Sequence, residues 1–154
     1  MELITTYICK EFDLGIHSNM FGGRIMSIID ESAGAYAAQV CDTPHMVTIK
    51  VDGLSFKKPV KIGNILKVYG KVESFGNTSM NLYMEMRRHN VYTGEQETVT
   101  STHITFVRID TDGNPIPISD LVKVRYRERV KRFKKALLDK EERLKEKEQL
   151  KVVS

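Results

Sequence analysis

The sequence of 154 residues contains only two cysteines and no long apolar segment. Cys9 and Cys41 are too few for the disulfide framework of a small secreted scaffold, so we expect a protein of the reducing cytoplasm. The first nine residues lack the basic and apolar regions of a signal peptide. No stretch approaches the roughly 20 apolar residues that a transmembrane helix needs, so we expect no membrane span.

The common catalytic and metal-binding motifs are also missing. The sequence has no HExxH, no pair of CxxC motifs, no P-loop and no GxSxG. Its four histidines lack the spacing of metal ligands, so no metal site is predicted. Cys41 and His45 lie four residues apart at the expected end of a helix, where we rank a cysteine nucleophile below a structural role.

The net charge of +4 is unevenly distributed along the chain. Residues 120–151 carry 13 Lys and Arg against 7 Asp and Glu, whereas the rest carries 11 against 13. The basic character therefore belongs to the C-terminal tail, and it gives no reason to expect a body that binds nucleic acid.

The order of the expected elements predicts an α+β fold. A hydrophobic content of 41% suits one globular domain with its own core. Residues 5–9 read as a short strand, and residues 23–40 as a helix that is apolar on almost every side and belongs inside the domain. Mostly antiparallel strands are expected at 45–56, 64–75, 78–88 and 97–109, the third with Met80, Leu82, Met84 and Met86 on one face.

A second, amphipathic helix is expected from Ser119, which is a good N-cap residue. Its apolar stripe is formed by Tyr126, Val130, Phe133 and Leu137.

The segment Asn19–Gly23, followed seven residues later by Asp30, carries the clearest chemical signal. Two adjacent glycines at the start of a helix let a second backbone or a ligand approach closely. The free N–H groups of the first helical turn and the positive end of the helix dipole suit an oxygen that develops negative charge. Asp30 places a carboxylate in an otherwise apolar helix, where its burial needs a reason.

Four short blocks follow one another between residues 5 and 117: Asn19–Gly23 with Met26 and Asp30, Val51–Asn64, Gly76–Met80, and Thr105–Asp110 leading to Gly113–Pro117. Each block is a weak signal by itself. Together and in this order they resemble the hotdog-fold acyl-CoA thioesterases, specifically the small bacterial acyl-CoA hydrolases related to brain acyl-CoA hydrolase. The loop before Asn19 is shorter than is usual in that family.

The resemblance implies a curved antiparallel sheet wrapped round the helix of residues 23–40. This hotdog domain would span residues 1–117, with a basic helical extension over 118–154. The resemblance also implies dimers that join their sheets, often assembled further into hexamers as trimers of dimers. Acyl-CoA would be the substrate, and no cofactor is needed because CoA arrives as part of it.

Weighed singly, each candidate residue also has a plainer structural interpretation. Asp30 alone would more often bond a neighbouring strand, the glycines alone would be turn residues, and Asn19 alone would cap the helix. With the four blocks, catalysis is favoured for Asp30, and the Gly23 N–H is favoured as the oxyanion donor. Glu31 is expected to be solvated or paired at an interface.

Further residues are candidates for binding the substrate. The resemblance places Thr78 and Ser79 near the thioester or the pantetheine arm. Charge-assisted bonds to the CoA phosphates require basic groups, although each such group is more often a solvated surface charge. The basic candidates are Lys57, Lys58, Arg88 and Arg108.

The leading hypothesis is hydrolysis of acyl-CoA to a free fatty acid and CoA. Asp30 would act as general base on a water, with direct nucleophilic attack as a less favoured route, and Asn19 would orient the water or bond the carbonyl. The alternative is a non-catalytic acyl-CoA-binding hotdog module whose basic tail recruits a partner. A dehydratase is a weaker option, because it would want a histidine on the helix.

Spacing along the helix constrains this site. Gly23 and Asp30 are separated by about 10 Å at a rise of 1.5 Å per residue. One carbonyl can hardly contact both, so an unbroken helix predicts that the two residues act together from different subunits.

Overall fold

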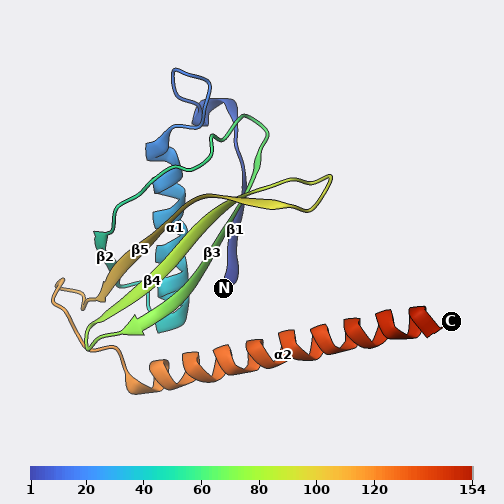
Figure 1. The fold of residues 1–154 in the computed structure, drawn as a ribbon. Coiled ribbons are helices and arrows are strands. Elements are labelled where there is room, and N and C mark those ends of the chain that lie inside the picture. The colour runs from blue at the N-terminus through green and yellow to red at the C-terminus, as the bar shows by residue number, and fades with distance from the viewer. Residues whose placement is uncertain (154) are drawn as a thin grey trace. The chain divides into compact units, whose positions relative to one another are not determined.

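The structure is a computed structural model that describes residues 1–153. Over this range, five strands form one antiparallel sheet in the order β1-β3-β4-β5-β2 (Figure 1). The strands are β1 (Glu2–Ile8), β2 (Met46–Val51), β3 (Ile65–Phe75), β4 (Ser79–His89) and β5 (Gln96–Arg108), and the helices are α1 (Gly22–Cys41), α2 (Asp120–Val153) and the 3₁₀ turn η1 (Glu11–Asp13). The α+β prediction is confirmed, with a helix after the first strand and a second helix at the C-terminal end.

The alternating pattern of β4 forms the centre of the core. Met80, Leu82, Met84 and Met86 are all fully buried, as their spacing predicts. The Sγ of Cys41, at the end of α1, lies 3.6 Å from the Sδ of Met80. Burying an aliphatic or methionine side chain of this kind contributes about 1.5–3 kcal/mol, so this face fixes the register of the sheet against the helix.

The helix α1 lies against the sheet and contacts every strand (Figure 1). It runs unbroken for 20 residues and ends where Asp42 adopts a left-handed conformation, with φ of 51°. Its buried side includes Ile25, Ile29 and Ala33, whereas Met26 is 42% exposed. The expectation of burial on almost every side is therefore wrong for the single chain, because the sheet covers one side of the helix only.

The strand predicted at residues 45–56 is wrong beyond Val51. After that residue the regular ladder ends. The N–H groups of Asp52 and Lys57 still donate to carbonyls of β5, and threonine side chains of β5 bond two carbonyls of this segment. Thr102 donates to the carbonyl of Asp52 over 3.1 Å, and Thr100 donates to that of Ser55 over 2.7 Å. Asp and Gly are depleted in strands, which agrees with an early end to β2. The strand β2 is an edge of the sheet.

The chain divides into two compact units, one of residues Met1–Ile118 and one from Ser119 onward. The second unit consists of α2, which begins as expected after Ser119. The hydroxyl of Ser119 accepts a hydrogen bond from the backbone N–H of Val122 at 3.3 Å. In the described residues, no helix combines the length and apolar character needed to cross a bilayer.

Candidate active site

The loop before α1 is held by backbone hydrogen bonds on both sides of Asn19. The carbonyl of Asn19 accepts from the N–H of Gly15 at 2.7 Å, and the N–H of Met20 donates to the carbonyl of Val60 at 2.7 Å. The loop closes where the N–H of Phe21 donates to the carbonyl of Asp13 at 2.8 Å. These bonds fix the entrance to α1 against the segment that follows β2.

A cleft of about 300 Å³ opens at this entrance. It is bordered by Asn19 and Gly22 on one side and by Phe56 and Lys58 on the other. A Cβ at Gly22 would lie 3.0 Å from Cε2 of Phe56, so the close approach of the ring needs a glycine there. The N–H groups of Gly22 and Gly23 belong to the first helical turn and have no acceptor within the helix.

The side chain of Asn19 carries a polar atom that lacks a hydrogen-bond partner. Its Oδ1 is buried and has no hydrogen-bond partner in the described chain. The interpretation of Asn19 as a helix cap is wrong, because Phe21 occupies the N-cap position and no side chain caps α1. A buried acceptor without a partner is costly, and Asn19 is one of the residues that line the cleft.

Asp30 lies in the middle part of α1 and is half-buried rather than buried. The hydroxyl of Thr48 on β2 donates to its Oδ1 over 2.8 Å. This bond to a neighbouring strand is the plainer interpretation of Asp30, and it also orients the carboxylate at the edge of the sheet. Glu31 is exposed, as expected.

Within one chain, Asp30 and the helix entrance stay apart. Because α1 is unbroken between Gly23 and Asp30, the two residues remain separated by about 10 Å along the helix. An unbroken helix was the condition for predicting a site shared between two subunits, and the structure meets this condition.

Thr78, Ser79 and Arg108 lie near the opposite end of α1. The N–H of Arg108 donates to the carbonyl of Thr78 at 2.9 Å, and the next residue, Ile109, donates to His45 just beyond the helix. The Arg108 guanidinium also donates from Nη1 to the carbonyl of Pro117 at 2.9 Å, while its Nε is buried without a partner in the described chain. The structure thus separates these three residues from Lys58 by roughly the length of α1, about 30 Å.

The basic candidates near the cleft differ in whether their side chains are already bound to other parts of the protein. Arg88 donates from Nη1 to the carbonyl of Pro59 at 2.8 Å and pairs with Glu97. The hydrogen bond from Arg88, its charge and the charge of Lys58 together hold the pKa of Glu97 below its ordinary value. Lys57 and Lys58 are exposed beside the cleft. Arg88 is therefore engaged in structure, and the two lysines remain the better phosphate candidates.

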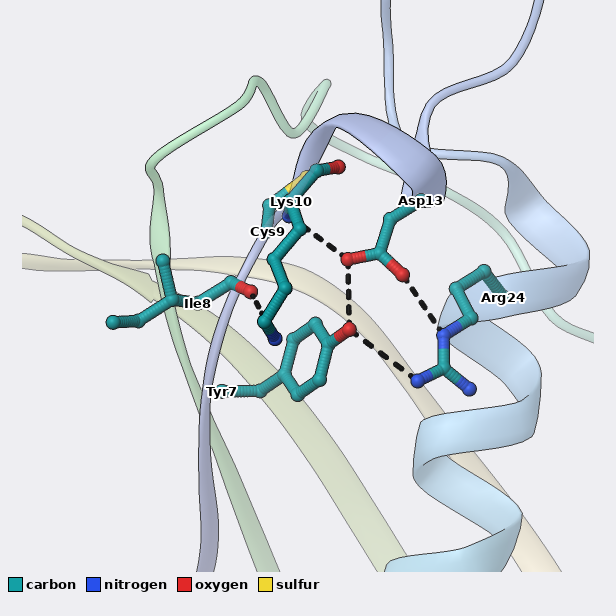
Figure 2. A network of polar contacts seen from close by, with 6 residues as sticks. All are labelled: Tyr7, Ile8, Cys9, Lys10, Asp13 and Arg24. Carbon is teal, nitrogen blue, oxygen red and sulfur yellow. Dashed lines mark hydrogen bonds and ion pairs between the residues drawn. The ribbon is translucent and has the colours of Figure 1, made fainter.

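A polar network that sequence reasoning missed lies behind the helix entrance. Figure 2 shows the carboxylate of Asp13 between Tyr7 of β1 and Arg24 of α1. Tyr7 donates its hydroxyl to Oδ2 over 2.7 Å, the N–H of Lys10 donates to the same oxygen over 2.9 Å, and Nε of Arg24 donates to Oδ1 over 3.0 Å. Burial acts to raise the pKa of Asp13, but these hydrogen bonds and the charge of Arg24 outweigh it, so the pKa lies below its ordinary value.

Asp13 lies three residues after Lys10 and bonds its N–H, as the second residue of a capping box would, but lysine has no side-chain acceptor and the local sequence contains no signal for the network. In residues 1–153, no group of three His, Cys, Asp or Glu side chains is placed to hold a metal ion.

Sequence comparisons connect this geometry to a family. Residues 17–95 match the family model of the Thioesterase superfamily. YkhA of Bacillus subtilis, named as an uncharacterized acyl-CoA thioester hydrolase, is 31% identical over 133 residues, which cover 79% of this chain and 77% of that protein. The acyl-CoA thioester hydrolase YciA of Salmonella typhimurium is 28% identical over 120 residues, covering 76% of this chain and 90% of that protein.

Solved structures agree with the sequence match. A hexameric hotdog-fold thioesterase of Campylobacter jejuni superposes with a TM-score of 0.73 at 33% identity, covering 82% of this chain and 96% of that one. An acyl-CoA hydrolase of Staphylococcus aureus, solved with butyryl-CoA and CoA, gives a TM-score of 0.70 at 27% identity over 92% of this chain and 91% of that one. The chain therefore belongs to the Thioesterase superfamily, as a hotdog-fold enzyme of the acyl-CoA thioester hydrolase type.

Proposed function

We propose that this protein hydrolyses acyl-CoA to a free fatty acid and CoA at the entrance to α1. One observation carries the proposal: the cleft brings the first turn of α1, with the open N–H of Gly22, next to Asn19, whose buried Oδ1 has no partner in the described chain. Backbone N–H donors held at a helix start stabilise the oxyanion of acyl transfer, and the Asn19 acceptor is suited to a water. The named activity of the Bacillus relative and the butyryl-CoA bound to the Staphylococcus enzyme support acyl-CoA as the substrate.

In the proposed reaction the thioester carbonyl lies over the first turn of α1, where the Gly23 N–H receives its developing negative charge. Asp30 takes a proton from water, and the resulting hydroxide attacks the carbonyl carbon. The tetrahedral intermediate then collapses, the carbon–sulfur bond breaks, and the CoA thiolate leaves and takes up a proton. Asn19 is better suited to orient the water than to polarise the carbonyl, because its orphaned atom is an acceptor.

The separation of Gly23 and Asp30 makes the proposed site a shared one. The carboxylate of Asp30 is tied to β2, an edge strand on which Ile49 is 60% exposed. A second copy that pairs with this edge about a two-fold axis would run its own α1 in the opposite direction. One chain would then supply the helix entrance and the other chain Asp30.

The same symmetry accounts for the substrate-binding candidates. In an antiparallel pair with Asp30 of one chain at the entrance of the other, the far end of each α1 extends about 16 Å beyond its partner's entrance. Thr78, Ser79 and Arg108 of one chain would then extend the cleft that Lys58 borders in its partner. We propose a dimer as the catalytic unit and a trimer of dimers as the assembly, which the hexameric Campylobacter neighbour supports.

The setting and organisation of the enzyme complete the proposal. We propose a cytoplasmic enzyme, in keeping with two cysteines, Cys9 and Cys41, that are free and buried. The hotdog unit of residues 1–117 would carry the chemistry, and the basic extension of residues 118–154 would not. The reaction as written uses no resident cofactor.

The test is release of free CoA thiol by Asp30→Asn, which keeps the shape of the side chain and removes the base. General acid–base catalysis contributes roughly 10²–10⁴-fold, so we expect a loss in that range. Glu31→Gln, a neutralised neighbour on the exposed side, is the matched control and should stay near wild type. Activity of Asp30→Asn within about threefold of wild type would exclude Asp30 as the base.

The same assay decides between enzyme and binding module. If the wild type sequesters acyl-CoA without releasing thiol, it is an acyl-CoA-binding module and the proposed hydrolysis is wrong.

A further inference from the structure

The buried carboxylate of Asp13 is the most completely satisfied charged group near the proposed site. Its side chain is 0% exposed and receives three hydrogen bonds, from Tyr7, Lys10 and Arg24. Arg24 also donates from Nη2 to the Tyr7 hydroxyl at 3.3 Å, so the three side chains form a closed set (Figure 2). The set joins β1, η1 and the first turn of α1.

Asp13 is also the residue at which the loop carrying Asn19 closes. Its carbonyl accepts from the N–H of Phe21 at 2.8 Å, so its backbone holds the end of the loop and its side chain holds the start of the helix. Between these points, Leu14 forms a bridge with Met20. Asn19 therefore sits on a short closed loop whose two ends meet at one residue.

The two charges in this network depend on each other. A buried carboxylate is costly unless fully paired, and Asn or Ser would close a loop more cheaply. Arg24 is the third residue of α1, where a cation faces the unfavourable, positive end of the helix dipole. Without Arg24 the Asp13 carboxylate would lack its buried ion pair, and without Asp13 the Arg24 cation would be unfavourable at the helix start. Together they fix the direction in which α1 leaves the loop.

We propose that Asp13 is a positioning residue for catalysis: through Tyr7 and Arg24 it holds the Asn19 loop and the first turn of α1 in the geometry that the thioester carbonyl requires. This inference rests on the proposed hydrolysis at the helix entrance. A misplacement of about 1 Å at such a site can cost about 100-fold in rate. Loss of the hydrogen bonds of Asp13 should therefore lower kcat while KM changes little.

The experiment compares Asp13→Asn, Tyr7→Phe and Glu128→Gln with wild type, using butyryl-CoA as substrate. Each variant is assayed only as folded, correctly assembled protein isolated by gel filtration. We expect Asp13→Asn to lose about 10–100-fold in kcat with KM within about threefold, and Tyr7→Phe to lose less in the same direction. Glu128→Gln removes one charge of an exposed pair on α2 and should not change kcat.

A double variant separates positioning from a general structural effect. If Asp13 acts through the Asn19 loop, Asp13→Asn combined with Asn19→Ala should be scarcely slower than the slower single variant, because both damage one arrangement. Losses that multiply would overturn the proposal, as would an Asp13→Asn enzyme with wild-type kcat. If Asp13→Asn does not fold, Tyr7→Phe decides by the same criteria.

Failure of this inference is distinguishable from failure of the proposed function. An Asp30→Asn enzyme that remains active overturns the hydrolytic mechanism. An inactive Asp30→Asn beside an unimpaired Asp13→Asn overturns the positioning role alone.

Discussion

Gly22 is the residue at which the cleft is most sensitive to a single added carbon. An alanine Cβ there would lie 3.0 Å from Cε2 and 3.1 Å from Cζ of Phe56, so the ring must shift by a few tenths of an ångström. Because Phe56 borders the cleft, we expect Gly22→Ala to lower kcat/KM for butyryl-CoA by about tenfold. Gly53→Ala, whose Cβ meets nothing within 4 Å, is the control. Equal activity of the two variants would contradict the role of this contact.

The pKa of Asp13 predicts how stability depends on acidity. Since the folded-state pKa lies below the ordinary value of about 3.9, the carboxylate stabilises the fold fully above that value, and the contribution is lost as the pH falls through the folded-state pKa. Asp13→Asn lacks the titrating group. We expect its Tm deficit to be constant from about pH 5 to 8 and to shrink below about pH 4.

Thermal unfolding followed by circular dichroism across this range checks the prediction. The charged and titratable groups that face Asp13 are Tyr7, Lys10 and Arg24, with the Cys9 thiol nearby. A deficit that widens toward low pH would contradict the assignment.

Some residues of the site could be predicted from the sequence, and others could not. The spacing of Gly22, Gly23 and Asp30 was visible, because helix periodicity and glycine punctuation are local signals. Asp13 could not be predicted, because its partners Tyr7 and Arg24 come from a strand and a helix that meet only in the folded chain.

Among the elements, β4 and β2 show where pattern reasoning works and where it stops. The strict alternation in β4 left one possible register, and all four of its predicted inward residues are buried. The strand expected to reach Phe56 ends at Val51, and beyond it Thr100 and Thr102 of β5 bond carbonyls of the segment with their side chains. Such hydrogen bonds depend on the side chains of the neighbouring strand, so the sequence of the segment itself does not predict them.

The outer part of α2 should be dispensable for chemistry. Beyond Asp139 the helix is exposed throughout, including Leu144 at 51% and Leu150 at 71%, and charges of both signs alternate along it. We expect a chain truncated after Asp139 to release thiol at within about twofold of the wild-type rate, and light scattering measures its assembly state. Loss of activity in a correctly assembled truncation would show that α2 contributes to the site.

At the scale of the whole molecule, a single chain leaves two neighbouring surfaces without a partner. The edge strand β2 exposes Ile49 by 60% and Val47 by 41%, and the open side of α1 exposes Met26 by 42%. Free edges with apolar side chains invite pairing with another strand, and in the dimer that we propose a second copy would cover both surfaces. Asp30 lies between these surfaces through its bond to Thr48, so assembly and catalysis are expected to depend on the same contact.

A mixing experiment tests whether the site is shared between chains. Asn19→Ala and Asp30→Ala proteins, each expected to retain a measurable activity of no more than a few per cent of wild type, on the order of a 100-fold loss, are unfolded together and refolded as a mixture. If Asn19 and Asp30 serve one carbonyl from opposite chains, every mixed dimer contains one doubly damaged and one intact site. Random pairing makes half of the dimers mixed, so about a quarter of all sites, and about a quarter of wild-type thiol release, should return.

The two parents refolded separately are the controls, and a tag on one of them confirms by pull-down that mixed dimers form. Recovery toward a quarter supports a shared site and shows that both residues matter. Absence of recovery in demonstrated mixed dimers would mean that Asn19 and Asp30 act within one chain or that Asn19 has no catalytic role. A same-chain site would require α1 to break between Gly23 and Asp30, since the unbroken helix keeps these residues about 10 Å apart.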